Sequence, residues 1–425
     1  MRRLQFSRLA PGLLMRRKIS VGTGFEAVDR AVANRIIEES FSTDAPYSPS
    51  AALQLTPSEA SSWLWDYCLD AKPRLTPEAL RGQARNAVDP FQLVEKDVST
   101  LSGGIKELLG SDHPVLQQCA RYFFEMDGGK KIRPVMVLAV SYALNAQSSA
   151  VNKFRVSPQQ RRLAEITEMI HTASLFHDDV IDKATTRRGV PTVNKVFGNK
   201  LAILGGDFLL SRASVALARL RSLDVVELLS TVIEHLVKGE VMQMKPYVFN
   251  FDDENGRSIS HQALEYYLRK NFYKTASLMG NSCLAAAVLG RHHLDHQRAC
   301  YLYGTYVGQA FQLIDDALDF EGSIQAIGKA PLADLKSGLA TAPILFAAEE
   351  FPKLVTLIGR KFEGPGDVDE AVNLVGRSRG IERTKLLAQV IFVEQQFFAD
   401  YKYRCTVSEP STPYASSSRP RQEIA

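Results

Sequence analysis

Apolar side chains recur at spacings of three and four residues from residue 89 to about residue 390. This period is typical of amphipathic helices, and the alternation of apolar and polar residues that marks strands is nearly absent. Pro246 and Asn255-Gly256 interrupt the period and predict a loop at 246–259 between two helices. The pattern therefore predicts an all-α domain over 89–390.

The segments on either side of this domain differ in composition. Residues 41–88 include a run rich in Ser, Pro and Ala, which is typical of a linker or an N-terminal extension. Residues 391–425 combine an apolar cluster with a Ser/Pro tail, and we expect this atypical tail to be disordered.

The N-terminal segment, residues 1–40, is basic. Its first 25 residues hold six basic side chains, and the first acidic residue is Glu26. That composition is typical of a mitochondrial transit peptide, with a disordered basic terminus as the alternative. The six basic residues are Arg2, Arg3, Arg8, Arg16, Arg17 and Lys18.

Composition narrows the classes of function. With 425 residues, 45% of them hydrophobic, the chain can bury a large core. A net charge of +4 is modest for this length and does not indicate nucleic-acid binding. No continuous apolar run approaches the roughly 18 residues of a membrane-spanning helix, so we expect a soluble protein. The cysteines lack the paired spacing of a zinc site or a disulfide framework, and those in the helical region are expected in the core. They are Cys68, Cys119, Cys283, Cys300 and Cys405.

Two copies of the pattern Asp-Asp-x-x-Asp, at 178–182 and 315–319, stand in apolar surroundings. Residues four apart share a helix face, which pairs Asp178 with Asp182 and Asp315 with Asp319. One copy alone is more often a solvated helix face. Two copies in similar surroundings favour a metal site, because buried carboxylates need compensation. Dense carboxylate oxygens suit Mg²⁺, which bridges carboxylates to phosphates.

Basic residues accompany the two triplets. Gly128-Gly129 precedes Lys130 and Arg133, which fall on one face of a helix that begins there, an arrangement that suits a diphosphate. Other basic residues follow the first triplet or lie near the ends of later helical stretches; any one of them is more often a solvated cation. They are Arg187, Arg188, Lys274 and Lys329.

In order and spacing these motifs resemble those of the trans-polyprenyl diphosphate synthase family, from Gly128 to about Ala388. Lys131 stands where the family usually has Arg, which keeps the charge. The resemblance implies the isoprenoid synthase fold, an antiparallel helix bundle around a central cavity. The matching stretches are GGKKIRP (128–134), HTASLFHDDVIDKATTRRGVPTVN from His171, GNKLAILGGDFLLSRA (198–213), KTASL (274–278), GQAFQLIDDALDFEG (308–322) and GKAPLADLKSGLATAPIL (328–345).

The resemblance also implies a reaction, in which isopentenyl diphosphate is joined by successive 1'-4 condensations to an allylic diphosphate such as farnesyl or geranylgeranyl diphosphate. It implies that Mg²⁺ is coordinated by Asp178, Asp182 and Asp315, with Asp179, Asp316 and Asp319 as ligands or as their support. The residues that would face the allylic diphosphate are Arg187, Lys274, Thr275, Gln312 and Lys329. Those that would hold isopentenyl diphosphate are Lys130, Arg133, His171 and Arg188. His177, next to the first triplet, is expected to be structural.

Product length is predicted from Ala173 and Ser174, five and four residues before Asp178. If the growing chain runs back along this helix, the two positions lie one turn below the diphosphate. Both are small, although small residues also allow close helix packing. By resemblance, a product of hexaprenyl to decaprenyl length is expected, and the expected mitochondrial location suggests the side chain of ubiquinone.

There are three alternatives to a long-chain synthase. They are a geranylgeranyl diphosphate synthase, a class I terpene cyclase and a non-catalytic partner subunit. A cyclase would carry a different second metal motif. A partner subunit would be expected to have lost motif residues, but the departure from the family pattern after Gln389 keeps it open. We further expect a homodimer or a heteromer with a related subunit, and peripheral contact with a membrane.

Overall fold

A computed structural model describes residues 89–110, 113–125, 131–146, 156–187, 189–244, 259–321 and 332–392, all within one compact unit. The predicted transit peptide, linker and tail lie outside the described residues, apart from the first two tail residues, and so do Lys130, Arg188 and Lys329. The domain boundaries stay predictions.

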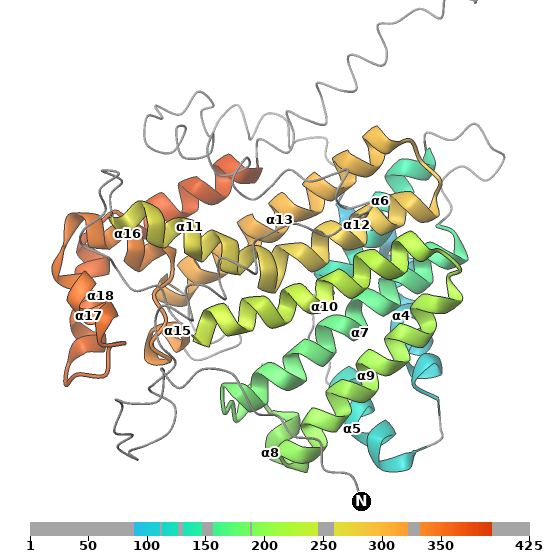
Figure 1. Ribbon diagram of the computed structural model, residues 1–425, viewed down its shortest axis with the longest axis horizontal. Helices are drawn as coiled ribbons and strands as arrows, with labels where there is room; N and C mark the ends of the chain where they lie inside the picture. The colour runs from blue at the N-terminus through green and yellow to red at the C-terminus, as the bar shows by residue number, and fades with distance from the viewer. Residues whose placement is uncertain are drawn as a thin grey trace, which may run out of the picture. The chain divides into compact units, whose positions relative to one another are not determined.

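The described residues are helical, as predicted, with one two-stranded hairpin in which β1 pairs antiparallel with β2. Helices α12 and α13 lie side by side, and α7 packs against α6 and α9 (Figure 1). The elements are α4 (Pro90–Leu109), α5 (Pro114–Glu125), α6 (Ile132–Ala146), α7 (Pro158–Ile181), β1 (Thr186–Arg187), β2 (Val190–Pro191), α8 (Val193–Phe197), α9 (Asn199–Arg219), α10 (Leu223–Met244), α11 (Ile259–Asn271), the π-helical turn η3 (Phe272–Ala276), α12 (Ser277–Leu289), α13 (Leu294–Glu321), α15 (Ala333–Lys336), α16 (Ala342–Glu350), α17 (Lys353–Gly359) and α18 (Asp367–Arg377).

Local sequence explains where the triplet-bearing helix α7 begins. Ser157 accepts a hydrogen bond from the backbone of Gln160, and the Gln160 side chain accepts one from the Ser157 backbone. This capping box satisfies two backbone donors that a helix start leaves without partners. Pro158 follows at the first helical position, where a missing N–H costs nothing.

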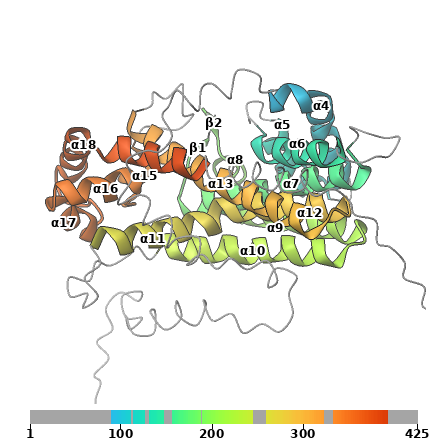
Figure 2. The same cartoon turned by 90° about the horizontal axis from the view of Figure 1, so that it is seen from above.

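Two large apolar clusters form the core. The larger one contains side chains from α4, α5, α6, α7, α9, α10 and α12. The second joins α11 and α13 to α16, α17 and α18, which gather at one end of the helical bundle (Figure 2). Residues 380–392 are also helical, and Leu387, Ala388 and Ile391 complete the second cluster. The described chain thus carries helical packing past Gln389, where its sequence departs from the family pattern.

Cys119, Cys283 and Cys300 are buried and free, which confirms the expectation that they are core residues. Cys68 and Cys405 lie outside the described residues.

Helix α9 is the one described helix that is long and apolar enough to cross a membrane, by length and composition alone. Its mean hydropathy is 1.5, and 39% of the apolar window is buried inside the protein. The search for a continuous apolar run did not find this helix, because Asp207 and Arg212 interrupt its apolar residues. In the structure Ala202, Leu209 and Ala213 of this helix belong to the larger core, so it packs as a core helix of the bundle.

Candidate active site

The first acidic triplet lies at the C-terminal end of α7. Asp182 caps the helix and is exposed, Asp178 is half-buried, and Asp179 is only 2% exposed. Asp179 is held by Arg187 of β1, whose Nη2 lies 2.7 Å from Oδ1 and whose Nε lies 3.1 and 3.2 Å from the two carboxylate oxygens. The middle Asp of the triplet is therefore turned inward and paired, while the outer two share the other side of the helix.

The outer carboxylates carry charge in an unfavourable place. Burial raises the pKa of Asp178 to about 6, with Lys274 opposing the shift and the carboxylates of Glu240 and Asp182 adding to it. Burial also raises the pKa of Asp182. The C-terminus of a helix already carries the negative end of its dipole. A cation bound here would offset the burial of both carboxylates and the negative end of the helix dipole.

The second triplet lies in the last turns of α13, and here both the middle acid Asp316 and the last acid Asp319 are buried. Asp316 is 2% exposed, and both of its carboxylate oxygens accept hydrogen bonds, from Tyr267 Oη at 2.5 Å and from Gln312 Nε2 at 2.8 Å. Burial, with the nearby Asp334 adding to it, raises the pKa of Asp316 to about 7. Asp315 is half-buried, whereas Asp319 is buried and its Oδ2 accepts a hydrogen bond from the backbone of Asp334 at 3.4 Å.

A single π-helical turn, η3, lies between the two triplets. Its Lys274 Nζ donates to Glu240 Oε2 at 2.5 Å and to Gln243 Oε1 at 3.0 Å, both from α10. The next residue, Thr275, donates to Gln312 Oε1 of α13 at 2.9 Å. Such π turns often occur at functional sites, because the extra residue re-aims the side chains that follow.

Charge and close packing hold this turn in place. Burial lowers the pKa of Lys274, but the carboxylates of Asp178 and Glu240 outweigh burial, so the pKa is raised and the ammonium stays charged. Gly239 of α10 allows the approach, since a Cβ there would lie 2.5 Å from Lys274 Cγ. Gly308 does the same for α13, where a Cβ would lie 2.5 Å from Ala276 Cα.

Arg133 and His171, assigned from sequence to isopentenyl diphosphate, meet across α6 and α7. Arg133 Nη1 lies 3.0 Å from His171 Nε2. Lys131 precedes α6 with a left-handed φ of 46°, so the helix begins at Ile132 and the expectation of a helix that begins at Lys130 was wrong. Lys131 Nζ donates to Ser102 Oγ of α4 at 2.9 Å. His177 instead faces α9, with Nε2 3.3 Å from the carbonyl oxygen of Ile203.

The two residues assigned to product length have different surroundings. Ser174 is half-buried, shares a helix face with Asp178, and donates from Oγ to the His171 carbonyl at 2.8 Å. Ala173 is fully buried in the larger core cluster.

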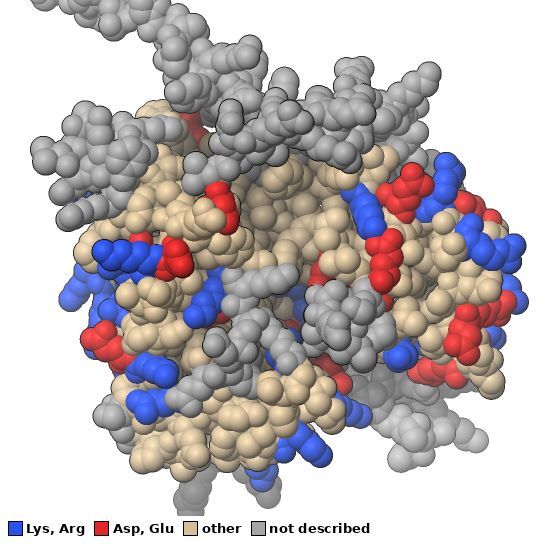
Figure 3. Space-filling view, turned by 180° about the vertical axis from the view of Figure 1, so that it is seen from behind, with Lys and Arg blue, Asp and Glu red and all other residues tan. Residues whose placement is uncertain are grey.

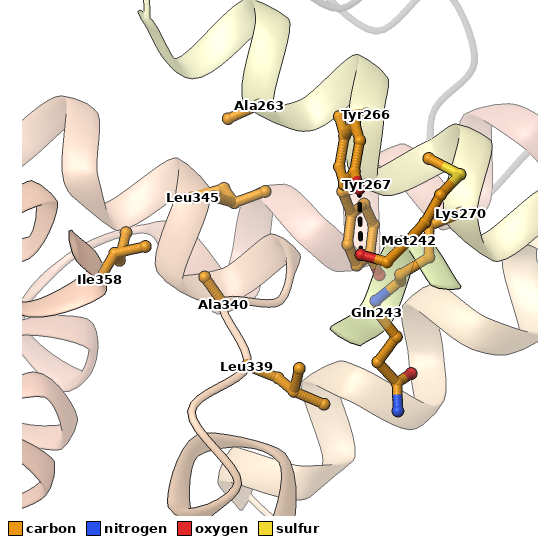
Figure 4. A pocket seen from close by; sticks show the side chains of 10 residues that line it. All are labelled: Met242, Gln243, Ala263, Tyr266, Tyr267, Lys270, Leu339, Ala340, Leu345 and Ile358. Carbon is orange, nitrogen blue, oxygen red and sulfur yellow. Dashed lines mark hydrogen bonds between the residues drawn. The ribbon is translucent and has the colours of Figure 1, made fainter. Parts of the chain in front are cut away.

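A small pocket opens beside the second triplet, between α10, α11 and α16 (Figure 4). Tyr266, Tyr267, Lys270 and Gln243 form its polar side, and aliphatic side chains such as Leu345 form the rest. Elsewhere, on the face in Figure 3, basic and acidic side chains are interspersed, and a uniformly basic patch is not seen among the described residues there.

Among the described residues, no three Asp, Glu, His or Cys side chains come close enough to hold a metal ion by themselves. The carboxylate oxygens of Asp178 and Asp182, whose pKa values are raised, are nevertheless donors suited to a hard divalent cation. The substrate's own oxygens would have to complete its coordination.

Residues 113–375 match the family model described as "Polyprenyl synthetase", and these residues hold both triplets, Arg133, His171 and the η3 turn. The chain belongs to the polyprenyl synthetase family. It is a trans-prenyltransferase, a long-chain all-trans-polyprenyl diphosphate synthase. Enzymes of this family use a divalent metal.

Relatives support this assignment. A Neurospora crassa protein named "Probable hexaprenyl pyrophosphate synthase, mitochondrial" is 47% identical over 71% of this chain and 75% of its own length. Decaprenyl-diphosphate synthase subunit 1 of Schizosaccharomyces pombe is 42% identical over 69% and 80%. The crystal structure of a Caulobacter crescentus polyprenyl synthase with calcium and isoprenyl diphosphate is 29% identical, with a TM-score of 0.63 over 73% of this chain and 90% of that one.

Sequence reasoning missed four residues of this site. Glu240 and Gln243 accept hydrogen bonds from Lys274, Tyr267 donates one to Asp316, and Lys270 attracts Asp316 electrostatically. The spacing of three between Glu240 and Gln243, and again between Tyr267 and Lys270, puts each pair on one helix face. That signal was present, but neither pair belongs to an acidic triplet or a glycine-rich stretch.

Proposed function

We propose that the two triplets bind Mg²⁺ together with the diphosphate of the allylic substrate, through Asp178, Asp182 and Asp315. The observation that carries this proposal is the placement of Lys274 and Thr275. Lys274 interacts electrostatically with Asp178 and Asp182 of the first triplet, and Thr275 is linked through Gln312 to the second. A diphosphate between the triplets would meet Lys274 and Thr275 together.

The other three acids then support these metal ligands and do not bind the metal themselves. They are Asp179 and Asp316, the middle acids of the two triplets, and Asp319. Asp179 is fully occupied by Arg187, and both oxygens of Asp316 accept hydrogen bonds from side chains. Metal ligands are held in direction by such outer contacts.

The reaction follows from charge. Bound Mg²⁺ would supply positive charge that neutralises the diphosphate as it leaves the allylic carbon. Lys274, Thr275, Gln312 and Arg187, together with Lys329, would hold the same diphosphate and orient it. Arg133 and His171, with Lys130 and Arg188, would hold isopentenyl diphosphate so that its double bond reaches the allylic cation. We assign no side-chain base, because the departing diphosphate can accept the proton that is lost.

The decisive test is incubation of the purified full chain with farnesyl diphosphate, labelled isopentenyl diphosphate and Mg²⁺, followed by sizing of the products. Elongation that stops on chelation and resumes on adding Mg²⁺ supports the proposal. A folded chain that condenses nothing under these conditions would contradict the proposal for the isolated chain and leave the alternative of a non-catalytic partner subunit standing.

We propose that the product lies in the hexaprenyl to decaprenyl range and serves as a ubiquinone side chain. One support is that Ala173 and Ser174 are small, so neither carries an aromatic ring that would block a chain growing along this helix. The other is the names of the relatives. Products of geranylgeranyl length in the same assay would contradict it.

We propose a mitochondrial location, supported by the basic segment 1–40 and the mitochondrial relative. A fluorescent reporter fused behind residues 1–40 should enter mitochondria, and a matched fusion with the six basic residues replaced by Gln should stay in the cytosol. Cytosolic retention of the unaltered fusion would contradict the location.

We propose that the enzyme works as an oligomer, either with itself or with a related subunit. Helix α10 exposes an apolar row in which Val237, Val241 and Met244 are 61%, 46% and 63% exposed. Such a row is expected to be covered in solution. Light scattering of the chain alone, and again after co-expression with a related subunit, decides between the two forms; a monomer in both would contradict the proposal.

A further inference from the structure

The residues around Asp316 form one continuous line of hydrogen bonds. Thr275 donates to Gln312, Gln312 donates to Asp316, and Tyr267 donates to the other oxygen of Asp316. The line joins three elements: η3, which carries Lys274, helix α13, which carries the second triplet, and helix α11.

Tyr267 closes this line from a distant part of the sequence. It lies 49 residues before Asp316, and its side chain is 3% exposed. The ammonium of Lys270, one turn further along α11, lies 5.2 Å from the centre of the Tyr267 ring. Lys270 also attracts Asp316 electrostatically. A cation over an aromatic face is held by the ring's quadrupole. Tyr267 therefore donates a hydrogen bond to Asp316 and also holds the Lys270 ammonium with its ring.

This anchoring has a consequence for the outer carboxylate. Consecutive residues of a helix point about 100° apart, so a side chain pinned at Asp316 sets the rotation of the last turns of α13. That rotation decides where Asp315 points. Asp179 has the same inward position in the first triplet, where Arg187 holds it directly as an ion pair.

We propose that Tyr267, with Lys270 over its ring, is a positioning residue for the second metal triplet: it pins Asp316 and so directs Asp315 toward the diphosphate-bound metal. The inference rests on the proposed metal site. Tyr267 contacts neither substrate nor metal in this role.

The chain supplies a matched control beside it. Tyr266 is the adjacent tyrosine on α11 and lines the same pocket, but its hydroxyl donates to the backbone carbonyl of Met242 at 3.0 Å rather than to a carboxylate (Figure 4). Tyr267→Phe and Tyr266→Phe each remove one hydroxyl from one pocket, and only the first releases Asp316.

Mg²⁺ binding is measured by titration calorimetry in the presence of farnesyl thiolodiphosphate, an analogue that does not turn over. Tyr267→Phe should weaken apparent Mg²⁺ affinity roughly tenfold to a hundredfold, as expected for loss of an outer contact to a metal ligand. Tyr266→Phe should match the parent. In steady-state assays Tyr267→Phe should raise the Mg²⁺ requirement and lower kcat, with the KM for isopentenyl diphosphate within about twofold of the parent.

A double-mutant cycle tests the route through Asp316. If Tyr267 acts through Asp316, Tyr267→Phe/Asp316→Asn should bind Mg²⁺ no more weakly than Asp316→Asn alone. Should Tyr267→Phe fail to fold, Lys270→Met removes the cation over the ring and should weaken Mg²⁺ affinity in the same direction. Unchanged Mg²⁺ affinity in Tyr267→Phe, or in Lys270→Met where it is needed, overturns the inference while leaving the metal site intact. A parent chain that binds no Mg²⁺ with the analogue overturns both.

Discussion

The Lys274 ammonium lies 2.5 Å from a carboxylate oxygen of Glu240, and both side chains are largely buried, at 18% and 13% exposed. Glu240 comes from α10, 34 residues earlier in the chain. Before substrate binds, Glu240 is the anion that holds Lys274 beside Asp178. The diphosphate proposed to bind Lys274 would therefore have to share or displace this contact.

This relationship predicts the effect of Glu240→Gln. The amide keeps the size of the side chain and a hydrogen-bond acceptor but removes its charge, so Lys274 becomes a stronger attractor for anions. Metal-free affinity for farnesyl diphosphate should rise several-fold, while kcat falls because Lys274 loses its fixed position. Calorimetry and steady-state rates measure the two effects. Glu234→Gln, which breaks an exposed pair with Lys238 on the same helix, is the control and should change neither.

The two diphosphate sites should separate in mutants. Lys274→Ala should raise the KM for the allylic diphosphate and Arg133→Ala that for isopentenyl diphosphate, because losing a charge-assisted contact to phosphate costs roughly 1.5–3 kcal/mol. Substrate titrations at saturating Mg²⁺ test this. Equal losses for both substrates in both variants would show that the assignment of the sites is wrong.

Neighbouring acids of the first triplet should behave in opposite ways. Asp178 has a raised pKa, so Asp178→Asn removes a disfavoured charge and should stabilise the fold by about 1–3 kcal/mol while lowering kcat at least about a hundredfold. Asp179→Asn leaves Arg187 without its carboxylate and should destabilise the fold by about 1–3 kcal/mol. Urea unfolding with parallel rate measurements compares them. A stable, fully active Asp178→Asn variant would rule Asp178 out as a metal ligand.

Product length should respond to bulk near Asp178. Ser174→Phe should place a ring one turn below Asp178 and stop elongation at about the farnesyl or geranylgeranyl stage, without removing the first condensation. Ala173→Phe should shorten products too, but it adds a ring inside a packed core, which costs roughly 1–3 kcal/mol of stability. Reversed-phase sizing and thermal unfolding separate the two effects. Unchanged products from both folded variants would mean that the growing chain runs elsewhere.

Stability should depend on pH through His235. Burial lowers the pKa of this histidine to about 4, and its Nδ1 lies 2.6 Å from Ser277 Oγ. Between the ordinary histidine pKa of about 6.5 and 4, the unfolded chain binds a proton that the folded chain does not, so stability falls as the pH is lowered through this window, by up to about 3 kcal/mol.

Replacing the histidine isolates that contribution. His235→Gln should lose less stability than the parent between pH 7 and pH 4.5, measured by urea unfolding. His293→Gln, at a side chain that is 73% exposed, should keep the parent's pH dependence. Identical pH profiles for the parent and His235→Gln would contradict the prediction.

Sequence by itself determined the helical class and the two triplets, because these depend on periods and spacings within one helix. Family resemblance pointed to Arg133 and His171 separately, and the structure shows that they meet across α6 and α7. Only the tertiary structure decided which acid of each triplet turns inward, and which partners hold it there. Spacing within α13 cannot tell Asp315 from Asp316; Tyr267, 49 residues away, does so by placing a phenol donor on one side of the helix. Glu240 and Lys274 likewise meet because Gly239 lets α10 approach the π turn. Contacts of this kind arise from packing between distant segments, and local patterns carry no record of them.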